Sequence, residues 1–291
     1  MYSPLPRVAA VHDLSCVGRC SLTVVTPVLS ALGIQVCPLP TAILSTHLGW
    51  FRQVAFCDFT DHMTEFYRHW QEENITFDCI YTGFLASAQQ IDVVSTFIDT
   101  FAATEPLIVV DPVMGDEGKL YSVYTGALQE QMKKLICKAD VITPNYTEAC
   151  FLLGEAYEPD KVVPDTLRQW LIRLTAMGPS KAVITGIPHK DGKIINLAYD
   201  AHAKEHSEAS GEHIPIRYPG TGDIFAAVLT GALLQGKSLE RAIRQAADFV
   251  SFCVAITYQA GGPTREGVLL EQALPVLWNK NQEVYIHEGK P

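Results

Sequence analysis

Asp223 is the residue of this sequence best suited to do chemistry, because it follows two glycines at the start of a long apolar segment, residues 218–236. Gly220 and Gly222 lack a Cβ, so the backbone can adopt unusual dihedral angles and let a ligand approach its N–H groups. Apolar residues then recur at helical spacing, which predicts a helix N-terminus that favours an anion. Asp223 would lie beside a bound phosphate, where it can accept a proton from an attacking hydroxyl. The alternative is that Asp223 only caps the helix.

Three further carboxylates, Asp111, Asp116 and Glu148, can together neutralise a magnesium–nucleotide. Mg²⁺ prefers a few carboxylate oxygens, bound directly or through water, combined with substrate phosphates. Taken singly, Asp111 can instead cap its loop, and Glu148 can simply be an acid in the first turn of its helix. Their combination with an anion-binding helix start favours the magnesium–nucleotide interpretation.

The elements that position these residues follow from hydrophobic periodicity, which predicts five or more strand–helix units in series. Such a series implies a largely parallel sheet with helices on both faces and ligands at the carboxyl ends of the strands. Two later segments, residues 193–199 and 212–218, are expected to be antiparallel strands. The expected strands of the series are 7–12, 34–44, 77–84, 107–111, 140–143 and 181–186, and the expected helices include 22–32, 60–73, 87–101, 144–154 and 164–177.

Polar residues recur where the expected strands end, and this recurrence at one edge of the sheet predicts the site. His47 follows the second strand and can hydrogen-bond either a ligand or a backbone carbonyl. The loop 115–125 is polar and bears glycines, so it is a candidate mobile flap. The strand-end residues are Asp13, Ser45, Thr46, His47, Tyr81, Thr82, Gly83, Asp111, Asp116, residues 143–148 and Thr185.

Composition narrows the class of protein. With 48% hydrophobic and 19% charged residues, the chain is expected to be globular, and residues 1–291 are expected to form one domain. The net charge of −10 disfavours nucleic acid or an anionic membrane as the main partner and favours a small-molecule ligand. We expect a cytoplasmic protein, because no signal peptide or membrane span is evident. The eight cysteines are interpreted as reduced core residues.

Three short motifs are rejected as false matches. Residues 231–238 fit the P-loop pattern, but they lie within and after an expected helix that stops at Gly236. Phe225 replaces the third glycine of a dinucleotide fingerprint, which counts against a nicotinamide-dependent oxidoreductase. His202 and His206 have the spacing of a helical metal pair, but their polar surroundings favour a solvated loop.

Four segments together resemble the ribokinase-like superfamily, in order along nearly the whole chain. They are DPVMGD (111–116), ITPNYTEA (142–149), AVITG (182–186) and GTGD (220–223). Within that superfamily, VHDLSCVGRCS, PLPTAILSTHLG and YTGF (81–84) resemble the vitamin B6 branch, the pyridoxal kinases.

The resemblance implies a three-layer fold with a central, mainly parallel sheet, a homodimer, and ATP-dependent phosphorylation of the 5′-hydroxyl of pyridoxal, pyridoxine or pyridoxamine. It implies that Asp223 is the base and that Gly220, Thr221 and Gly222 form the anion hole. Mg²⁺ and ATP are the implied cofactors, with a monovalent cation as a further candidate. The residues implied for Mg²⁺ and nucleotide are Asp111, Glu148, Asp116, Asn145 and Thr185, and those implied for the vitamer are Asp13, Ser45, Thr46, His47, Tyr81 and Gly83.

The chain departs from the family pattern in the region expected to recognise the ring. Asp13 stands near a position where many members carry serine, and Phe84 stands where tyrosine is common. Residues 46–48 are Thr-His-Leu where many members have Asn-His-Thr. These departures leave vitamer preference open, with hydroxymethylpyrimidine as the nearest competing substrate. A non-catalytic B6-binding protein of the same fold is the alternative from outside the enzymes.

Overall fold

The computed structural model of the protein describes residues 5–121, 124, 126–159, 163–189, 191–212 and 214–288. Its described part contains one large sheet and one small hairpin. The large sheet has the order β11-β10-β9-β8-β5-β4-β1-β2-β3. Its strands are β1 (Arg7–Val17), β2 (Gln35–Thr46), β3 (Phe56–Asp58), β4 (Cys79–Thr82), β5 (Leu107–Val110), β8 (Val141–Ile142), β9 (Lys181–His189), β10 (Lys193–Asp200) and β11 (Glu205–Glu212), and the hairpin is β6 (Gly115–Asp116) with β7 (Lys119–Leu120).

The direction of the strands confirms the predicted parallel sheet. Six neighbouring strands, from β9 through β8, β5, β4 and β1 to β2, are parallel, whereas β3, β10 and β11 are antiparallel to their neighbours. The chain passes from β1 to β2 on one side and then returns to β4 on the other side of β1. This reversal opens a crevice at the carboxyl ends of β1 and β4, which is where such sheets bind ligands.

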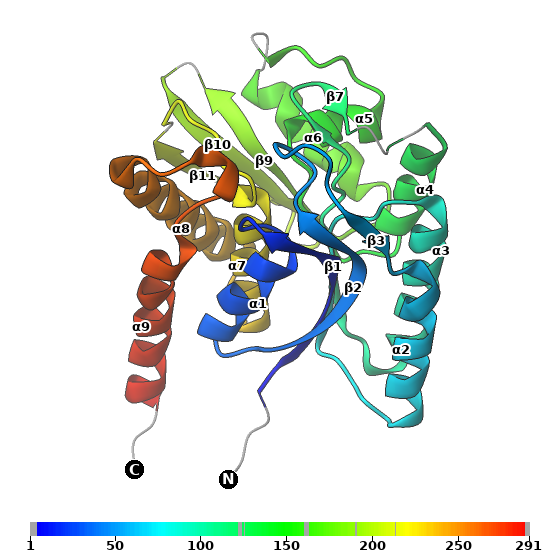
Figure 1. Cartoon of the computed structure of the whole chain (residues 1–291). Helices are drawn as coiled ribbons and strands as arrows, with labels where there is room; N and C mark the ends of the chain where they lie inside the picture. The colour runs from blue at the N-terminus through cyan, green and yellow to red at the C-terminus, as the bar shows by residue number, and fades with distance from the viewer. Residues whose placement is uncertain are drawn as a thin grey trace.

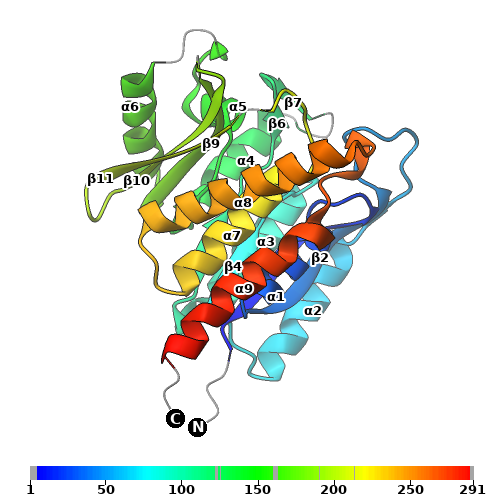
Figure 2. The ribbon, with the colours of Figure 1, turned by 90° about the vertical axis from the view of Figure 1, so that its left-hand side faces the viewer.

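Helices cover both faces of the sheet, which makes three layers (Figures 1 and 2). Val8 and Ala10 of β1 belong to the apolar core under α1, α7, α8 and α9, whereas Ala9 and Val11 belong to the core under α2 to α6. A strand buried on both faces must be apolar throughout, and this explains the continuous apolar run at the start of β1. The helices are α1 (Leu22–Ala31), α2 (Thr60–Glu72), α3 (Ala88–Phe101), α4 (Gly126–Ile136), α5 (Tyr146–Leu153), α6 (Pro164–Thr175), α7 (Thr221–Leu234), α8 (Leu239–Ala260) and α9 (Leu270–Glu288).

One strand was predicted in the wrong place. The partner of β10 is β11, Glu205–Glu212, and not residues 212–218, of which residue 213 lies outside the described part. The polar sequence EHSEASGE lacks a strand pattern of its own, and it is held as an edge strand by its antiparallel pairing with β10. His202 lies in the turn as expected, but His206 lies on β11, so the solvated-loop prediction is wrong for His206.

Two further predictions concern the P-loop pattern and the cysteines. The P-loop pattern is a false match as predicted, because α7 runs through Leu234, Gly236 has φ +77° and Ser238 caps α8.

All eight cysteines are free, yet the prediction that they are core residues is wrong for three of them, which are exposed. The exposed ones are Cys16, Cys57 and Cys137.

The candidate flap forms the β6–β7 hairpin, with its residues 122, 123 and 125 outside the described part. Among the described residues, no helix combines the length and the apolarity that crossing a bilayer requires.

Candidate active site

The first part of the site is the turn before α7. Gly220 precedes the helix with φ +81°, and a Cβ at this position would lie 2.0 Å from the carbonyl oxygen of Arg19. Gly220 is therefore required both by its backbone angle and by close contact with the loop after β1. Gly222, in contrast, has no atom within 4 Å of such a Cβ. The helix start is open on the Gly222 side, where its first N–H groups have no intrahelical acceptor.

Asp223 is half-buried in the first turn of α7, and its carboxylate is bound by a different segment of the chain. The Ser21 N–H donates to Asp223 Oδ2 at 2.9 Å, and no side-chain cap closes α7. The carboxylate therefore makes a contact beyond simple helix capping. Burial raises the pKa of Asp223 to about 7, the Ser21 hydrogen bond opposes this rise, and the nearby charge of Asp13 adds to it. A carboxyl group with this pKa can exchange a proton near neutral pH.

Asp13, at the end of the buried part of β1, lies close to Asp223 through their shared neighbour Ser21. The Ser21 hydroxyl donates to Asp13 Oδ1 at 2.6 Å, and the Ser15 hydroxyl donates to Asp13 Oδ2 at 2.8 Å. Burial raises the pKa of Asp13 and outweighs these two hydrogen bonds. The two serines were not among the residues predicted for the site.

Glu148 and Asp111 form the second group of buried carboxylates. Glu148 accepts hydrogen bonds from Met114 N at 3.0 Å and from Asn145 N at 2.8 Å, and with Asn145 it forms a capping box at the start of α5. Asp111 accepts one hydrogen bond from the Thr143 hydroxyl at 3.1 Å. Burial raises the pKa of both carboxyls, and the charge of Asp223 raises the pKa of Asp111 further. Both carboxylates would gain from a nearby cation.

Asn145 lies between the other two residues predicted to contact nucleotide, because it contacts both Thr185 and the hairpin that carries Asp116. Asn145 Nδ2 donates to the carbonyl of Gly115 at 2.9 Å, and an isolated parallel bridge joins Asn145 to Thr185. Asp116 is exposed on the β6–β7 hairpin, where its carboxylate pairs with Arg217 at 3.2 Å. Arg217, which precedes the turn of Gly220, was not predicted, and its pairing connects the hairpin to that turn.

The loop after β2 contacts the rest of the protein through His47. Gly49 N donates to Nδ1 of His47 at 3.3 Å, so Nε2 carries the proton and donates to the carbonyl of Arg265 at 2.7 Å. The sequence left open whether His47 bonds a ligand or a backbone carbonyl, and the structure shows the bond to a backbone carbonyl. Ser45 is exposed and bonds to the backbone of Ala55, and Thr46 ends β2.

Gly83 and Tyr81, at the end of β4, pack against His12. The rings of His12 and Tyr81 meet edge to face at 4.4 Å, and a Cβ on Gly83 would lie 2.2 Å from His12 Nδ1. Packing against His12 therefore accounts for the glycine. Burial lowers the pKa of His12 to about 3, so its ring is neutral. Both its nitrogens, the Tyr81 hydroxyl and the Thr82 hydroxyl lack partners among the described residues.

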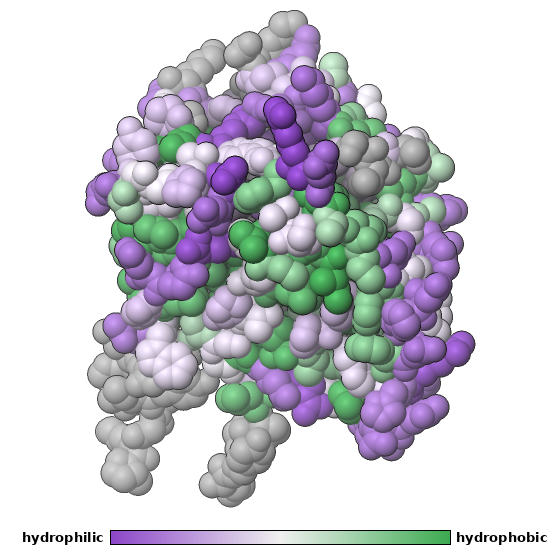
Figure 3. Space-filling model, in the orientation of Figure 1, coloured by the Kyte–Doolittle hydropathy of each residue, from purple (hydrophilic) through white to green (hydrophobic). Residues whose placement is uncertain are grey.

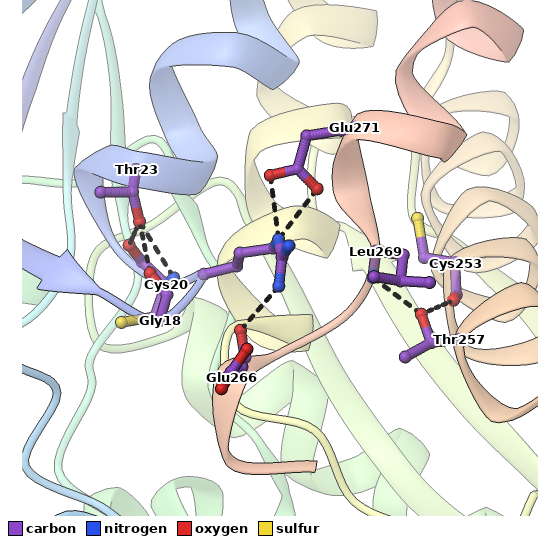
Figure 4. Close-up of polar contacts among 9 residues, drawn as sticks. Gly18, Cys20, Thr23, Cys253, Thr257, Glu266, Leu269 and Glu271 are labelled. Atoms are coloured by element: carbon purple, nitrogen blue, oxygen red, sulfur yellow. Dashed lines mark hydrogen bonds and ion pairs between the residues drawn. The ribbon is translucent and has the colours of Figure 1, made fainter. Parts of the chain in front are cut away.

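The connection between α8 and α9 holds the loop after β1 in place (Figure 4). Arg19 Nε bonds to both carboxylate oxygens of Glu271, at 3.0 and 2.9 Å, and Arg19 N donates to the carbonyl of Glu266 at 3.1 Å. Leu269 N donates to the Thr257 hydroxyl at 2.8 Å, which fixes the connection to α8. The loop that carries Ser21 is thereby fixed to the C-terminal helices.

The geometry combines an uncapped helix start, a carboxylate beside it and a second buried acidic pair, all at one edge of the sheet. Among the described residues, no cluster of three or more His, Cys, Asp or Glu side chains is arranged to hold a metal ion. A cation would therefore need ligands beyond the side chains of the Asp111–Glu148 pair, such as water and phosphate oxygens.

Comparisons with known proteins agree with this geometry. Residues 14–266 match the family described as phosphomethylpyrimidine kinase. A Bacteroides thetaiotaomicron protein provisionally assigned as a phosphomethylpyrimidine kinase, solved with pyridoxal, is 42% identical with a TM-score of 0.90 and covers 94% of this chain and 96% of its own. Pyridoxal kinase of Lactobacillus plantarum is 32% identical with a TM-score of 0.86, covering 97% and 99%. Pyridoxine/pyridoxal/pyridoxamine kinase of Bordetella avium is 32% identical over 68% of each chain.

Proposed function

The chain belongs to the phosphomethylpyrimidine kinase family and has the fold of the pyridoxal kinases, and from this premise we propose that it transfers the γ-phosphoryl group of ATP to the 5′-hydroxyl of pyridoxal, pyridoxine or pyridoxamine. One observation carries the proposal most directly. Asp223, with a pKa raised to about 7, lies at an open helix start and has one carboxylate oxygen bound by Ser21 N. This arrangement suits proton transfer beside a phosphate.

In the proposed reaction, Asp223 accepts the proton of the 5′-hydroxyl as the oxygen bonds to the γ-phosphorus. The bond between that phosphorus and the β–γ bridging oxygen breaks, and ADP leaves. The backbone N–H groups of Gly220, Thr221 and Gly222 are the proposed anion hole, supported by the helix dipole of α7. The proton then passes from Asp223 to solvent.

We assign the magnesium–nucleotide side of the site to Asp111 and Glu148, which would hold Mg²⁺ directly or through water. Burial of both carboxyls supports this assignment, because a divalent cation offsets the cost of two buried negative charges. When bound, Mg²⁺ would neutralise charge on the ATP phosphates. Asp116, Asn145 and Thr185 are proposed to contact the nucleotide. A monovalent cation remains a further proposed cofactor.

The vitamer is proposed to bind at the carboxyl ends of β1, β2 and β4, the crevice at the sheet's switch point. Asp13, with a buried carboxylate, is the residue best suited to a polar atom of the pyridine ring. The other residues proposed for this subsite are Ser45, Thr46, His47, Tyr81 and Gly83.

Hydroxymethylpyrimidine is the second candidate substrate, because a Haemophilus influenzae relative that is 30% identical over 62% of this chain is named hydroxymethylpyrimidine/phosphomethylpyrimidine kinase. A panel of ADP-release assays on the three vitamers and this pyrimidine separates the candidates. We expect the highest kcat/KM with a B6 vitamer. A higher kcat/KM with the pyrimidine would reverse the assignment, and binding of vitamers without ADP release would indicate a non-catalytic B6-binding protein.

We propose that the protein is a cytoplasmic homodimer with one domain per chain. Figure 3 shows apolar side chains gathered on the face that presents β1, β2 and β3. Large apolar residues exposed in these strands and the loop between β2 and β3 are Val17, Leu48, Trp50 and Phe56. Light scattering should give twice the mass of the chain, and Trp50→Asp should shift the mass toward that of one chain if this face is buried between copies.

A further inference from the structure

Ser21 joins the two carboxylates on the β1 side of the site. Its N–H donates to Asp223 Oδ2 at 2.9 Å, and its hydroxyl donates to Asp13 Oδ1 at 2.6 Å. Ser21 is buried, and these two bonds leave in different directions from the same residue. A change in the position of either carboxylate can therefore alter the position of the other through Ser21.

The backbone of Ser21 has an unfavourable conformation. Its φ of +49° and ψ of −132° lie in a region that glycine adopts readily and other residues rarely adopt. The direction of its N–H depends on these angles, because rotation about them turns the peptide plane. An unfavourable conformation at a buried position requires surrounding interactions that hold it.

Neighbouring hydrogen bonds hold the residues on each side of Ser21. The hydroxyl of Thr23 donates to the carbonyl of Cys20 at 2.7 Å and also lies within 3.2 Å of Gly18 O, as Figure 4 shows. Val24 N and Val25 N donate to the carbonyl of Ser21 at 2.9 and 2.8 Å. The Ser21 hydroxyl donates to Asp13 at 2.6 Å and also interacts with the Cys20 thiol. Because sulfur is a weak hydrogen-bond partner, the bond to Asp13 is the main constraint that acts through the Ser21 side chain.

We propose that Ser21 is a positioning residue for the base: its hydroxyl bond to Asp13 holds the backbone in the conformation that lets its N–H reach Asp223. This inference rests on the proposed function only in calling Asp223 the base. The geometric part of the proposal does not depend on that function: the hydrogen bond from the Ser21 hydroxyl to Asp13 maintains the hydrogen bond from Ser21 N to Asp223.

The surroundings of Asp223 make that single N–H bond important. Asp13 faces it from β1, Asp111 from the end of β5, the buried Tyr81 hydroxyl from β4, and the Cys20 thiol from the loop after β1. Each of these groups either carries negative charge or is a neutral acid whose pKa Asp223 raises. Among the interactions that shift the pKa of Asp223, the Ser21 N–H is the one that stabilises the ionised form. Losing it should raise the pKa of Asp223.

Two substitutions at the same position separate the roles of the hydroxyl and the backbone. Ser21→Ala removes the hydroxyl but keeps a Cβ, so the conformation at φ +49° loses its support. Ser21→Gly also removes the hydroxyl but adopts this conformation at little cost. If the hydroxyl acts by holding the backbone, glycine should restore what alanine loses. If the hydroxyl contacts substrate, both variants should fail alike.

The primary readout is the pKa of the Asp223 carboxyl, measured by carbon NMR on full-length protein labelled at aspartate Cγ, without nucleotide or Mg²⁺. Asp223→Asn identifies the resonance. We expect Ser21→Ala to raise this pKa by about one unit and Ser21→Gly to leave it within a few tenths of the wild-type value. In the kinase assay, the acidic limb of kcat/KM should shift in the same way, with a loss of about fivefold to tenfold for alanine near neutral pH.

Circular dichroism and thermal melting check that each variant is folded. If Ser21→Ala does not fold, Ser21→Cys replaces it in the same titration, with the same comparison to Ser21→Gly, because the thiol fills the space of the hydroxyl, keeps a Cβ and is only a weak donor. An unchanged Asp223 pKa in Ser21→Ala, or equal shifts in the alanine and glycine variants, would overturn the proposal. Because the titration needs no turnover, it gives a result even if none of the tested compounds is a substrate, which distinguishes its failure from failure of the proposed function.

Discussion

Glu148, which pairs with Asp111, and Asp223, which pairs with Asp13, are held in different ways at the carboxyl edge of the sheet. Glu148 has both oxygens bound by backbone N–H groups that belong to a capping box and to the segment after β5. Asp223 has a hydrogen bond to one oxygen, from Ser21 N. The two hydrogen bonds fix the orientation of the Glu148 carboxyl, whereas Asp223 keeps its second oxygen for a proton. The difference suits Glu148 to a fixed place beside a cation and Asp223 to proton transfer.

The largest expected effect comes from Asp223→Asn, which keeps the shape of the side chain and removes its basicity. Turnover should fall by about 10²- to 10⁴-fold, the usual contribution of a general base. Steady-state ADP release measures it. The matched control is Asp165→Asn, an exposed acid in the first turn of α6, which should leave turnover unchanged. Near-normal turnover of Asp223→Asn would remove the distinction between the two pairs.

The two glycines before Asp223 should respond differently to alanine. Gly220→Ala places a Cβ 2.0 Å from the Arg19 carbonyl oxygen at φ +81° and should destabilise the protein. A loss of about 2–4 kcal/mol is expected from backbone strain and steric clash. Gly222→Ala meets no atom within 4 Å and should change stability by less than about 1 kcal/mol. Urea unfolding measures both, and equal losses would mean that the turn does not pack on the loop after β1.

Asp111→Asn should stabilise the protein while impairing catalysis. The pKa of Asp111 is raised in the folded state, so folded protein binds this proton more tightly than the unfolded chain does. The cost of the buried charge is therefore full above the folded-state pKa and disappears as pH falls below the unfolded value of about 4.

Thermal melting without Mg²⁺ tests this linkage. The asparagine variant should melt a few degrees higher than wild type at about pH 8, with the gain vanishing toward about pH 4. A gain that does not depend on pH, or no gain, would show that Asp111 does not carry a costly buried charge.

Much of the fold followed from hydrophobic periodicity, because strands buried on both faces are continuously apolar. The structure confirms the predicted order of the central strands and helices along the chain. β11 was missed because EHSEASGE has no strand pattern, and its structure depends on pairing with β10. Local sequence does not encode an edge strand of this kind.

The sequence predicts site residues whose type alone indicates their chemistry. It does not predict residues whose role depends only on their position in the folded chain. Asp223 stood out through its glycines and apolar helix. Ser21 did not, because its contact with Asp223 spans 202 residues and depends on Gly220 packing against the loop after β1. Arg217 was missed for the same reason, since its partner Asp116 lies 101 residues away in sequence. Tertiary contacts of this kind have no local pattern.

The most direct test of the division between the two pairs is calorimetric binding of Mg²⁺ with a non-hydrolysable ATP analogue to three proteins. Asp223→Asn should bind it as tightly as wild type, within about twofold, because the proposed role of Asp223 is to accept the substrate's proton rather than to hold the nucleotide. Asp111→Asn should bind it at least about tenfold more weakly, because it would lose a charge that is proposed to lie beside Mg²⁺. Weak binding by Asp223→Asn together with unchanged binding by Asp111→Asn would contradict the account.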